Sequence, residues 1–235
     1  MYMKEQTSIK NFKLLNIFTG IFVGVLVLVP SMSSKFIAIG PLNIVGATLI
    51  FPITFIFNDI FTEVYGYSRS RKIIWTGMAM QVFAALFYWL IDIWQPASFW
   101  SNQACYSSIL GQAPRIVLAS LSAYFFGEFA NSLVLSKMKY SQGGKRGFKQ
   151  GWRFVASTIV GEGFDSFVFM SVGFAGVIAT PDLIKTILTI WGVKVLYEAI
   201  ALPISMPFAN WVKKIEGIDE IDKPETTSYN PFKLR

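Results

Sequence analysis

The stretch RFVASTIVGEGFDSFVFMSVGFAGVIA, residues 153–179, decides the fold class of this chain. It is apolar and long enough to cross a hydrocarbon core about 30 Å thick, which takes about 20 helical residues. It also carries two carboxylates, Glu162 and Asp165, with small and apolar neighbours. Asp165 is twelve positions beyond Arg153, a depth of about 18 Å in a helix. Because a charge at mid-membrane costs roughly 2.5–3.5 kcal/mol, these acids are expected to serve a substrate or a proton.

Working outward, stretches of the same kind complete six predicted spans: 12–34, 42–64, 73–95, 115–137, 153–179 and 184–211. Hydrophobic residues make up 53% of the chain and charged residues 15%, whereas a soluble domain carries about 25% charged residues. We therefore predict an all-α integral membrane protein, a bundle of six transmembrane helices. Residues 12–211 form its transport domain, between an N-terminal segment 1–11 and a loose C-terminal tail 212–235. The first span has no small-x-small cleavage site and is expected to remain as a helix.

Most of the 21 basic residues fall in segments 1–13, 69–72, 137–153 and 213–235. Positive charge favours the cytoplasmic side, so both termini are predicted to be cytoplasmic and the number of spans even. The run 137–153 is interpreted as an orienting loop that meets anionic lipid head groups, so nucleic acid is not an expected partner. The uncharged segment 96–114 is expected to be an extracytoplasmic loop or a short re-entrant cap.

The chain has no histidine and one cysteine, Cys105. It therefore lacks the commonest general base and the commonest metal ligand, and no metal or other cofactor is expected. An enzyme is not expected either. The phosphate-binding pattern G-x-x-x-x-G-K-[ST] is missing, so the chain cannot hydrolyse ATP itself. A secondary carrier or a facilitator is predicted. The alternative is a substrate-binding subunit whose energy-coupling ATPases are separate chains, and a homodimer is left open.

Polar side chains recur at helical spacing on four predicted spans. The second span ends with Asn58, Asp59 and Glu63. Glu63 is read equally well as a carboxylate that surfaces at the cytoplasmic interface. The fourth span carries Tyr124, Glu128 and Asn131 on one stripe, with Arg115 at its mouth. Arg115 is expected either to reach the interface or to draw an acidic group into the cavity. The small residues of this span are read as helix packing.

The sixth span carries Trp191, Lys194 and Glu198. An ion pair between Lys194 and Glu198 within the helix is one interpretation. In the other interpretation, the two charges and the neighbouring aromatic ring together hold a flat polar ligand. Together with the acids of the fifth span, these residues complete the predicted substrate site near mid-depth.

Four strings resemble the queuosine precursor transporter family, also called the vitamin uptake transporter family. They are NDIFTEVYGYSRSRK (58–72), QACYSSILGQAPRIVLASLSAYFFGEFAN (103–131), RFVASTIVGEGFDSFVF (153–169) and KVLYEAIALP (194–203). Their order and their places on the predicted spans carry the resemblance, which covers roughly 40–210. It implies import of 7-cyano-7-deazaguanine (preQ0) or 7-aminomethyl-7-deazaguanine (preQ1) through a bacterial inner membrane, for salvage of queuosine in tRNA.

The predicted residues suit that class of substrate. A deazaguanine presents an N–H and an exocyclic NH2 side by side, and one carboxylate accepts both. Its O6 needs a donor such as Asn58, Asn131, Lys194 or Arg115. Its ring fits the aromatic faces of Trp191 or Tyr124, because stacking of a base contributes about 1–3 kcal/mol. Spacing alone does not say which acid binds substrate and which pairs or carries a proton, and another purine-like molecule stays an alternative.

Overall fold

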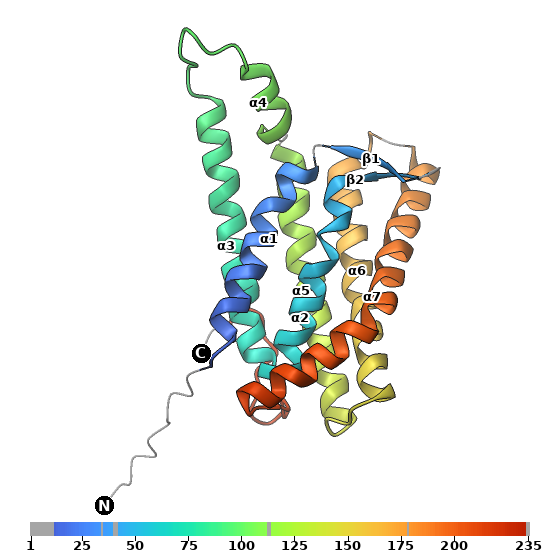
Figure 1. The fold of residues 1–235 in the computed structure, drawn as a ribbon. Helices are drawn as coiled ribbons and strands as arrows, with labels where there is room; N and C mark the ends of the chain where they lie inside the picture. Colours follow the sequence, from blue (N-terminus) through green and yellow to red (C-terminus); the bar gives the residue numbers. More distant parts are fainter. Residues whose placement is uncertain (1–11, 34, 40–41, 112–113, 178, 234–235) are drawn as a thin grey trace, which may run out of the picture.

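The computed structural model describes residues 12–33, 35–39, 42–111, 114–177 and 179–233. The described chain is mostly helical (Figure 1). Its elements are α1 (Leu15–Ser33), β1 (Phe36–Ile39), β2 (Leu42–Val45), the 3₁₀ helix η1 (Gly46–Leu49), α2 (Pro52–Ile60), the π-helix η2 (Phe61–Tyr65), α3 (Tyr67–Asp92), α4 (Gln103–Leu110), α5 (Pro114–Ser141), α6 (Phe148–Phe174) and α7 (Thr180–Glu216).

Within the described residues, five helical segments are long and apolar enough to cross a membrane: those of α1, α3, α5 together with α4, α6, and α7. Large apolar side chains cover their outer faces, and Ile200 and Ile204 on α7 are 68% and 76% exposed. Such an apolar exterior suits lipid and not water. The chain is therefore a helical membrane protein of several passes, as predicted.

The second predicted span is divided in the structure. Residues 42–45 form β2, which pairs antiparallel with β1 in the register Phe36↔Val45 and Ile39↔Leu42. The prediction of one continuous helix over 42–64 is therefore wrong at its start. The 3₁₀ helix η1 follows β2, and the α-helix begins only at Pro52, where a proline suits the first helical position because it lacks an N–H that would have no partner there. The apolar composition of this stretch did not distinguish the strand from a helix.

Helix α7 is long and bent. It spans Thr180–Glu216 and contains Pro203 and Pro207. Each proline removes a backbone hydrogen bond and crowds the preceding turn, which bends a helix. In Figure 1 the last turns of α7, in red, lie across the lower end of the bundle. This bend brings the end of α7 under the other helices.

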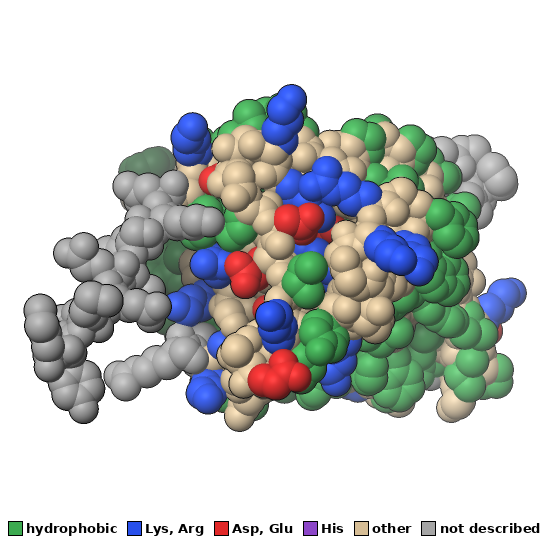
Figure 2. All heavy atoms as spheres, turned by 90° about the horizontal axis from the view of Figure 1, so that it is seen from below, with side chains coloured by type: hydrophobic (Ala, Val, Ile, Leu, Met, Phe, Trp, Pro, Cys, Tyr) green, Lys and Arg blue, Asp and Glu red, His purple; other side chains and the backbone are tan. Residues whose placement is uncertain are grey.

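One end of the bundle carries most of the charge, and we call it the charged end. Here η2 ends, α3 begins, α5 ends, α6 begins and α7 ends (Figure 1). Figure 2, which views this end, shows Lys and Arg side chains gathered around a few carboxylates. The start of α1 and the last described residues lie at the same end. The predicted N-terminal segment 1–11 lies outside the described residues.

The described part of the tail, residues 217–233, is packed against the charged end, so the prediction of a loose tail is wrong. The Asp222 carboxylate accepts hydrogen bonds from the Tyr67 backbone N–H at 2.8 Å and from the Ser136 hydroxyl at 2.6 Å. Tail carbonyl groups accept hydrogen bonds from the side chains of Arg71 and Trp75. Buried donors of the bundle thus find their acceptors in the tail, which composition alone did not reveal.

Helices α5 and α6 approach closely through two glycines. A Cβ atom at Gly127 would lie 2.9 Å from Asp165 Cβ, and one at Gly161 would lie 2.7 Å from Asn131 Cβ. No larger side chain fits at either position without a shift. The packing interpretation of the small residues on the fourth predicted span is confirmed at Gly127. This contact places the polar stripe of α5 against the acids of α6.

Candidate functional site

Five carboxylates from four helices gather inside the bundle, and we call them the acid cluster. They are Asp59 on α2, Glu128 on α5, Glu162 and Asp165 on α6, and Glu198 on α7, each at most 6% exposed. Among the described residues, the cation that forms ion pairs with them is Lys194 on α7. The acids thus outnumber the cation that neutralises them. This excess of carboxyl groups over cations is the main chemical feature of the membrane interior.

Lys194 binds two of the five acids. Its Nζ lies 2.7 Å from Glu162 Oε2 and 2.5 Å from Asp165 Oδ2. The same ammonium lies 4.5 Å from the centre of the Phe51 ring, a cation–π contact. The alternative of an ion pair between Lys194 and Glu198 is wrong, because the ammonium reaches across to α6 instead. Phe51 has no distinguishing signal in a chain with 22 phenylalanines, so sequence reasoning missed it.

Glu128 is a buried acid with both oxygens free. Neither Oε1 nor Oε2 has a hydrogen-bond partner among the described residues, and the side chain is fully buried. Glu128 also repels Glu162, Asp165 and Asp59 electrostatically. A buried carboxylate without donors is costly. Such a group suits a ligand that brings its own N–H donors, or a proton.

Further acceptors with no partner in the described structure surround the cluster. They include one oxygen each of Asp59 and Glu198 and the Asn131 carbonyl, together with the hydroxyls of Thr158 and Ser166. Asp59 Oδ1 accepts a hydrogen bond from Asn131 Nδ2 at 2.7 Å, which joins α2 to α5. The interior therefore presents acceptors from α2, α5, α6 and α7, the four helices predicted to build the site.

Asn58 lies next to the cluster, and its side chain forms three hydrogen bonds within the bundle. Its Nδ2 donates to the Glu128 carbonyl at 3.1 Å, and its Oδ1 accepts from Ser70 at 2.8 Å and Ser132 at 2.9 Å. These bonds join α2, α3 and α5. In this arrangement Asn58 positions the turn that carries Glu128, and one of the two N–H donors of its amide is engaged there.

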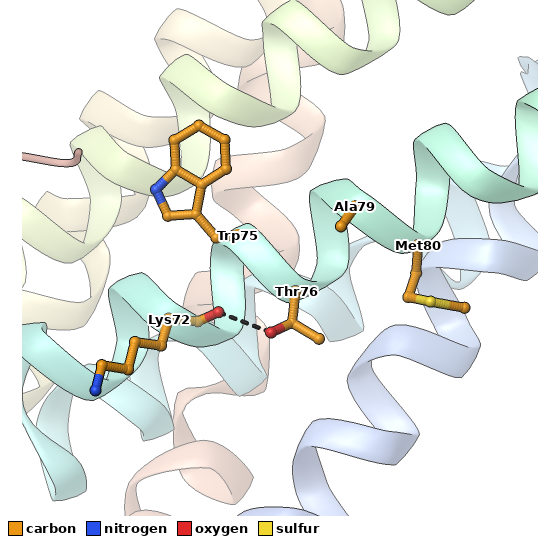
Figure 3. A pocket seen from close by; sticks show the side chains of 5 residues that line it. All are labelled: Lys72, Trp75, Thr76, Ala79 and Met80. Atoms are coloured by element: carbon orange, nitrogen blue, oxygen red, sulfur yellow. Dashed lines mark hydrogen bonds between the residues drawn. The ribbon is translucent and has the colours of Figure 1, made fainter. Parts of the chain in front are cut away.

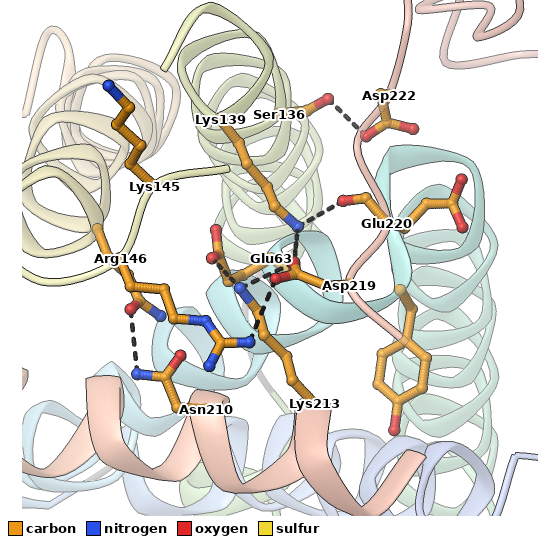
Figure 4. A network of polar contacts seen from close by, with 12 residues as sticks. Glu63, Ser136, Lys139, Lys145, Arg146, Asn210, Lys213, Asp219, Glu220 and Asp222 are labelled. Atoms are coloured by element: carbon orange, nitrogen blue, oxygen red, sulfur yellow. Dashed lines mark hydrogen bonds and ion pairs between the residues drawn. The ribbon is translucent and has the colours of Figure 1, made fainter. Parts of the chain in front are cut away.

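Glu63 belongs to a separate ion network at the charged end (Figure 4). Its carboxylate pairs with the Arg153 guanidinium and, at 2.6 Å, with Lys213 Nζ. Lys213 and Lys139 also bind Asp219, at 2.9 and 2.6 Å. Glu63 is 0% exposed, so the alternative of a carboxylate surfacing at the interface is wrong. The structure separates Glu63 from the acid cluster, because cations occupy both of its oxygens.

The same network changes the interpretation of the basic run 137–153. Lys139 and Arg153 are 1% and 0% exposed and bind protein groups, not the surface. Burial alone would raise the pKa of Asp219, but hydrogen bonds from Lys139 and Lys213 outweigh it and lower that pKa below its usual range. Lys139 and Arg153 thus close the charged end of the bundle.

The remaining predicted residues have different surroundings. The Tyr124 hydroxyl donates to the Ile74 carbonyl at 3.1 Å and joins α5 to α3. Arg115 is exposed and donates to the Val172 and Ala175 carbonyls at the end of α6, at 2.7 and 2.6 Å. The side chains of these two residues are tied to backbone groups, although Tyr124 still interacts electrostatically with Glu128. Trp191 donates to the Ile159 carbonyl at 2.9 Å, and its ring lies beside Gly163, between the two acids of α6.

Comparison with known proteins gives two matches. Residues 45–207 match a family described as "Putative vitamin uptake transporter". A protein of Bacillus subtilis (strain 168), named "Probable queuosine precursor transporter", is 28% identical over 179 residues, which cover 76% of this chain and 73% of the relative. No solved structure matches this chain. The matched family range contains the whole acid cluster.

Proposed function

Because the chain belongs to the vitamin uptake transporter family, we propose that it imports the 7-deazaguanine precursors of queuosine, preQ0 or preQ1, through a bacterial inner membrane. The name of the Bacillus subtilis relative supports this class of substrate, and the similarity spans about three quarters of both chains. Family membership places the chain among transporters of small molecules. The chemistry of the acid cluster supports the finer choice.

The Glu128 carboxylate carries this proposal. A deazaguanine offers an N–H and an NH2 side by side, and the two free oxygens of Glu128 can accept both. Asp165, one of the two acids predicted from the fifth span, already binds Lys194. We therefore assign the paired donors of the substrate to Glu128. The Lys194 ammonium has three donors and binds two acids, which leaves one for the substrate O6. Trp191, beside Gly163, supplies an aromatic face.

The second candidate acceptor lies across the cluster. Asp59 and Glu198 each keep an oxygen without a partner among the described residues, and they repel each other electrostatically. A cation between them removes that repulsion. The ammonium of preQ1 supplies one, whereas neutral preQ0 requires a proton in its place. The proposal therefore makes preQ1 binding less dependent on proton uptake than preQ0 binding.

We propose a secondary carrier of six spans, in which α2 and η2 together form the second. The charged end faces the cytoplasm, since basic residues concentrate on the cytoplasmic side of membrane proteins and gather at this end (Figure 2). Both termini are then cytoplasmic, and residues 12–211 form one transport domain. Protons released and taken up by the unpaired acids supply the coupling.

Uptake by the purified protein in liposomes tests this function. Labelled preQ1 and preQ0 should enter vesicles that contain this chain and no ATPase, and a pH gradient should change the rate for preQ0 more than for preQ1. Protein-free liposomes and excess unlabelled guanine serve as controls. Uptake that appears only with added energy-coupling subunits favours the alternative of a substrate-binding subunit. If neither compound enters vesicles of either kind, the proposed substrate class is wrong.

A further inference from the structure

Two adjoining hollows lie on α3 at the charged end, away from the acid cluster. The polar hollow has a volume of about 340 Å³, and its lining includes Arg69, Arg71, Lys72, Glu220, Asp222 and Thr226. The apolar hollow, of about 420 Å³, is lined by Lys72, Trp75, Thr76, Ala79 and Met80 (Figure 3). Lys72 borders both. A ligand at this place would therefore meet a polar and an apolar surface in succession.

The polar hollow contains a buried positive charge without an ion-pair partner among the described residues. Arg71 is 1% exposed, and its Nη1 donates to the Ser228 and Asn230 carbonyls at 2.7 and 2.8 Å. Its Nε has no acceptor in the described structure. Carbonyl oxygens satisfy two hydrogen bonds but supply no counter-charge. A buried guanidinium in this state favours a bound anion.

The carboxylates of the polar hollow are engaged elsewhere. Asp222 accepts hydrogen bonds from the Tyr67 N–H and the Ser136 hydroxyl, and Glu220 lies 3.8 Å from the Arg69 guanidinium. The Lys72 ammonium is exposed and forms no ion pair with a described residue. Arg71 and Lys72 are therefore the two cations available to an anion here, and the Thr226 and Thr227 hydroxyls line the same hollow.

The apolar hollow continues from Lys72 along one face of α3. Thr76, Ala79 and Met80 are exposed on that face, and Figure 3 shows Lys72 at one end of the row and Met80 at the other. The Thr76 hydroxyl donates to the Lys72 carbonyl at 2.9 Å, which leaves its methyl group for contact. Eight residues of helix place Met80 about 12 Å beyond Lys72. This length suits the first part of an acyl chain.

We propose that Arg71 and Lys72 bind the phosphate of an anionic phospholipid, and that one acyl chain of this lipid lies along α3 from Trp75 to Met80. A free phosphate ion would use the polar hollow alone and leave the apolar face of α3 without a role. The lipid matches both surfaces and the order in which they occur, because its head group lies at the charged end and its chains point toward mid-membrane. Basic pockets at the ends of membrane helices bind such head groups.

Native mass spectrometry of the full chain in detergent tests this site, with phosphatidylglycerol and phosphatidylcholine of equal acyl chains as probes. We expect one tightly retained phosphatidylglycerol per chain and at least about tenfold weaker retention of phosphatidylcholine. Both lipids offer a phosphate for charged hydrogen bonds, but only phosphatidylglycerol carries a net negative charge. Equal retention of the two lipids would overturn the proposal.

Two substitutions separate the two halves of the site. Lys72→Ala should weaken phosphatidylglycerol binding about tenfold or more, and Ala79→Trp should weaken it by filling the apolar hollow without a change in charge. Lys149→Ala is the matched control, because Lys149 is an exposed lysine at the same end that forms no ion pair with a described residue. An effect of Lys149→Ala equal to that of Lys72→Ala would show attraction to the whole charged end and would overturn a defined site.

Inorganic phosphate distinguishes the two sources of the anion. On the proposal, millimolar phosphate competes only weakly with phosphatidylglycerol, and Ala79→Trp leaves phosphate binding unchanged. If phosphate displaces the lipid completely and Ala79→Trp has no effect on lipid retention, the site binds a free anion and the proposed lipid is wrong. Thermal unfolding of each variant confirms that the compared proteins are folded.

Discussion

Replacing Glu128 by glutamine tests the proposed substrate site most directly. The substitution keeps the size of the side chain but turns one acceptor oxygen into an NH2 group. If Glu128 accepts both donors of a deazaguanine, this NH2 faces a donor of the substrate. Loss of a charged hydrogen bond contributes about 1.5–3 kcal/mol. The dissociation constant should therefore rise about tenfold to 150-fold.

The same variant should bind substrate more weakly but should be as stable as the wild type or more stable. Both Glu128 oxygens are buried without partners among the described residues, so the substitution removes a buried charge and breaks no bond between side chains. Unfolding of the substrate-free variant should occur at the same temperature as in the wild type or a higher one. Calorimetric titration with preQ1 and thermal unfolding in the same detergent measure the two effects side by side.

Glu63→Gln is the matched comparison, because Glu63 is an equally buried glutamate with both oxygens bound to cations. Breaking this network should destabilise the protein by about 3–5 kcal/mol, since the buried Arg153 loses its counter-charge and Lys213 keeps only Asp219. The affinity of the folded fraction should stay close to that of the wild type. Wild-type affinity for preQ1 in Glu128→Gln would refute the assignment of the substrate donors to this residue.

Three further predictions concern other parts of the molecule. Lys194→Met should leave two adjacent acids without a cation and lower stability by about 3–5 kcal/mol; unchanged thermal unfolding would show that the ion pairs contribute nothing. The depressed pKa of Asp219 means that its carboxylate stabilises the fold above its unfolded pKa of about 3.9, and that this contribution disappears as the pH falls through the folded pKa. Asp219→Asn should therefore lower stability at pH 7 and leave it unchanged at the acid limit. The exposed Glu220→Gln control should leave stability unchanged at both pH values. Cys105 on α4 is exposed at the end opposite the charged end, so an impermeant thiol reagent should label it in intact cells; labelling only after permeabilisation would contradict cytoplasmic termini.

The sequence by itself determined that this is a membrane protein, and it identified the helices that carry the polar residues of the site. Long apolar stretches specify membrane helices because backbone groups in lipid must be satisfied within the segment. The spacing of Glu128 and Asn131, and of Glu162 and Asp165, put each pair on one helix face. The structure brings these four residues together with Asp59 and Glu198. The bounds of the second predicted span were not determined, because an apolar run of this kind fits a strand or a helix.

Only the tertiary structure decided which acid is paired and which is free. Lys194 is four residues from Glu198, yet it binds Glu162 and Asp165 on the neighbouring helix. Glu63 and Asp59 are also four residues apart on one segment, but one belongs to the charged end and the other to the acid cluster. The reason is physical: the partner of a buried charge is set by helix crossings, such as that of Gly127 with Gly161. Spacing along one helix says which side chains share a face, and the crossing determines what that face meets.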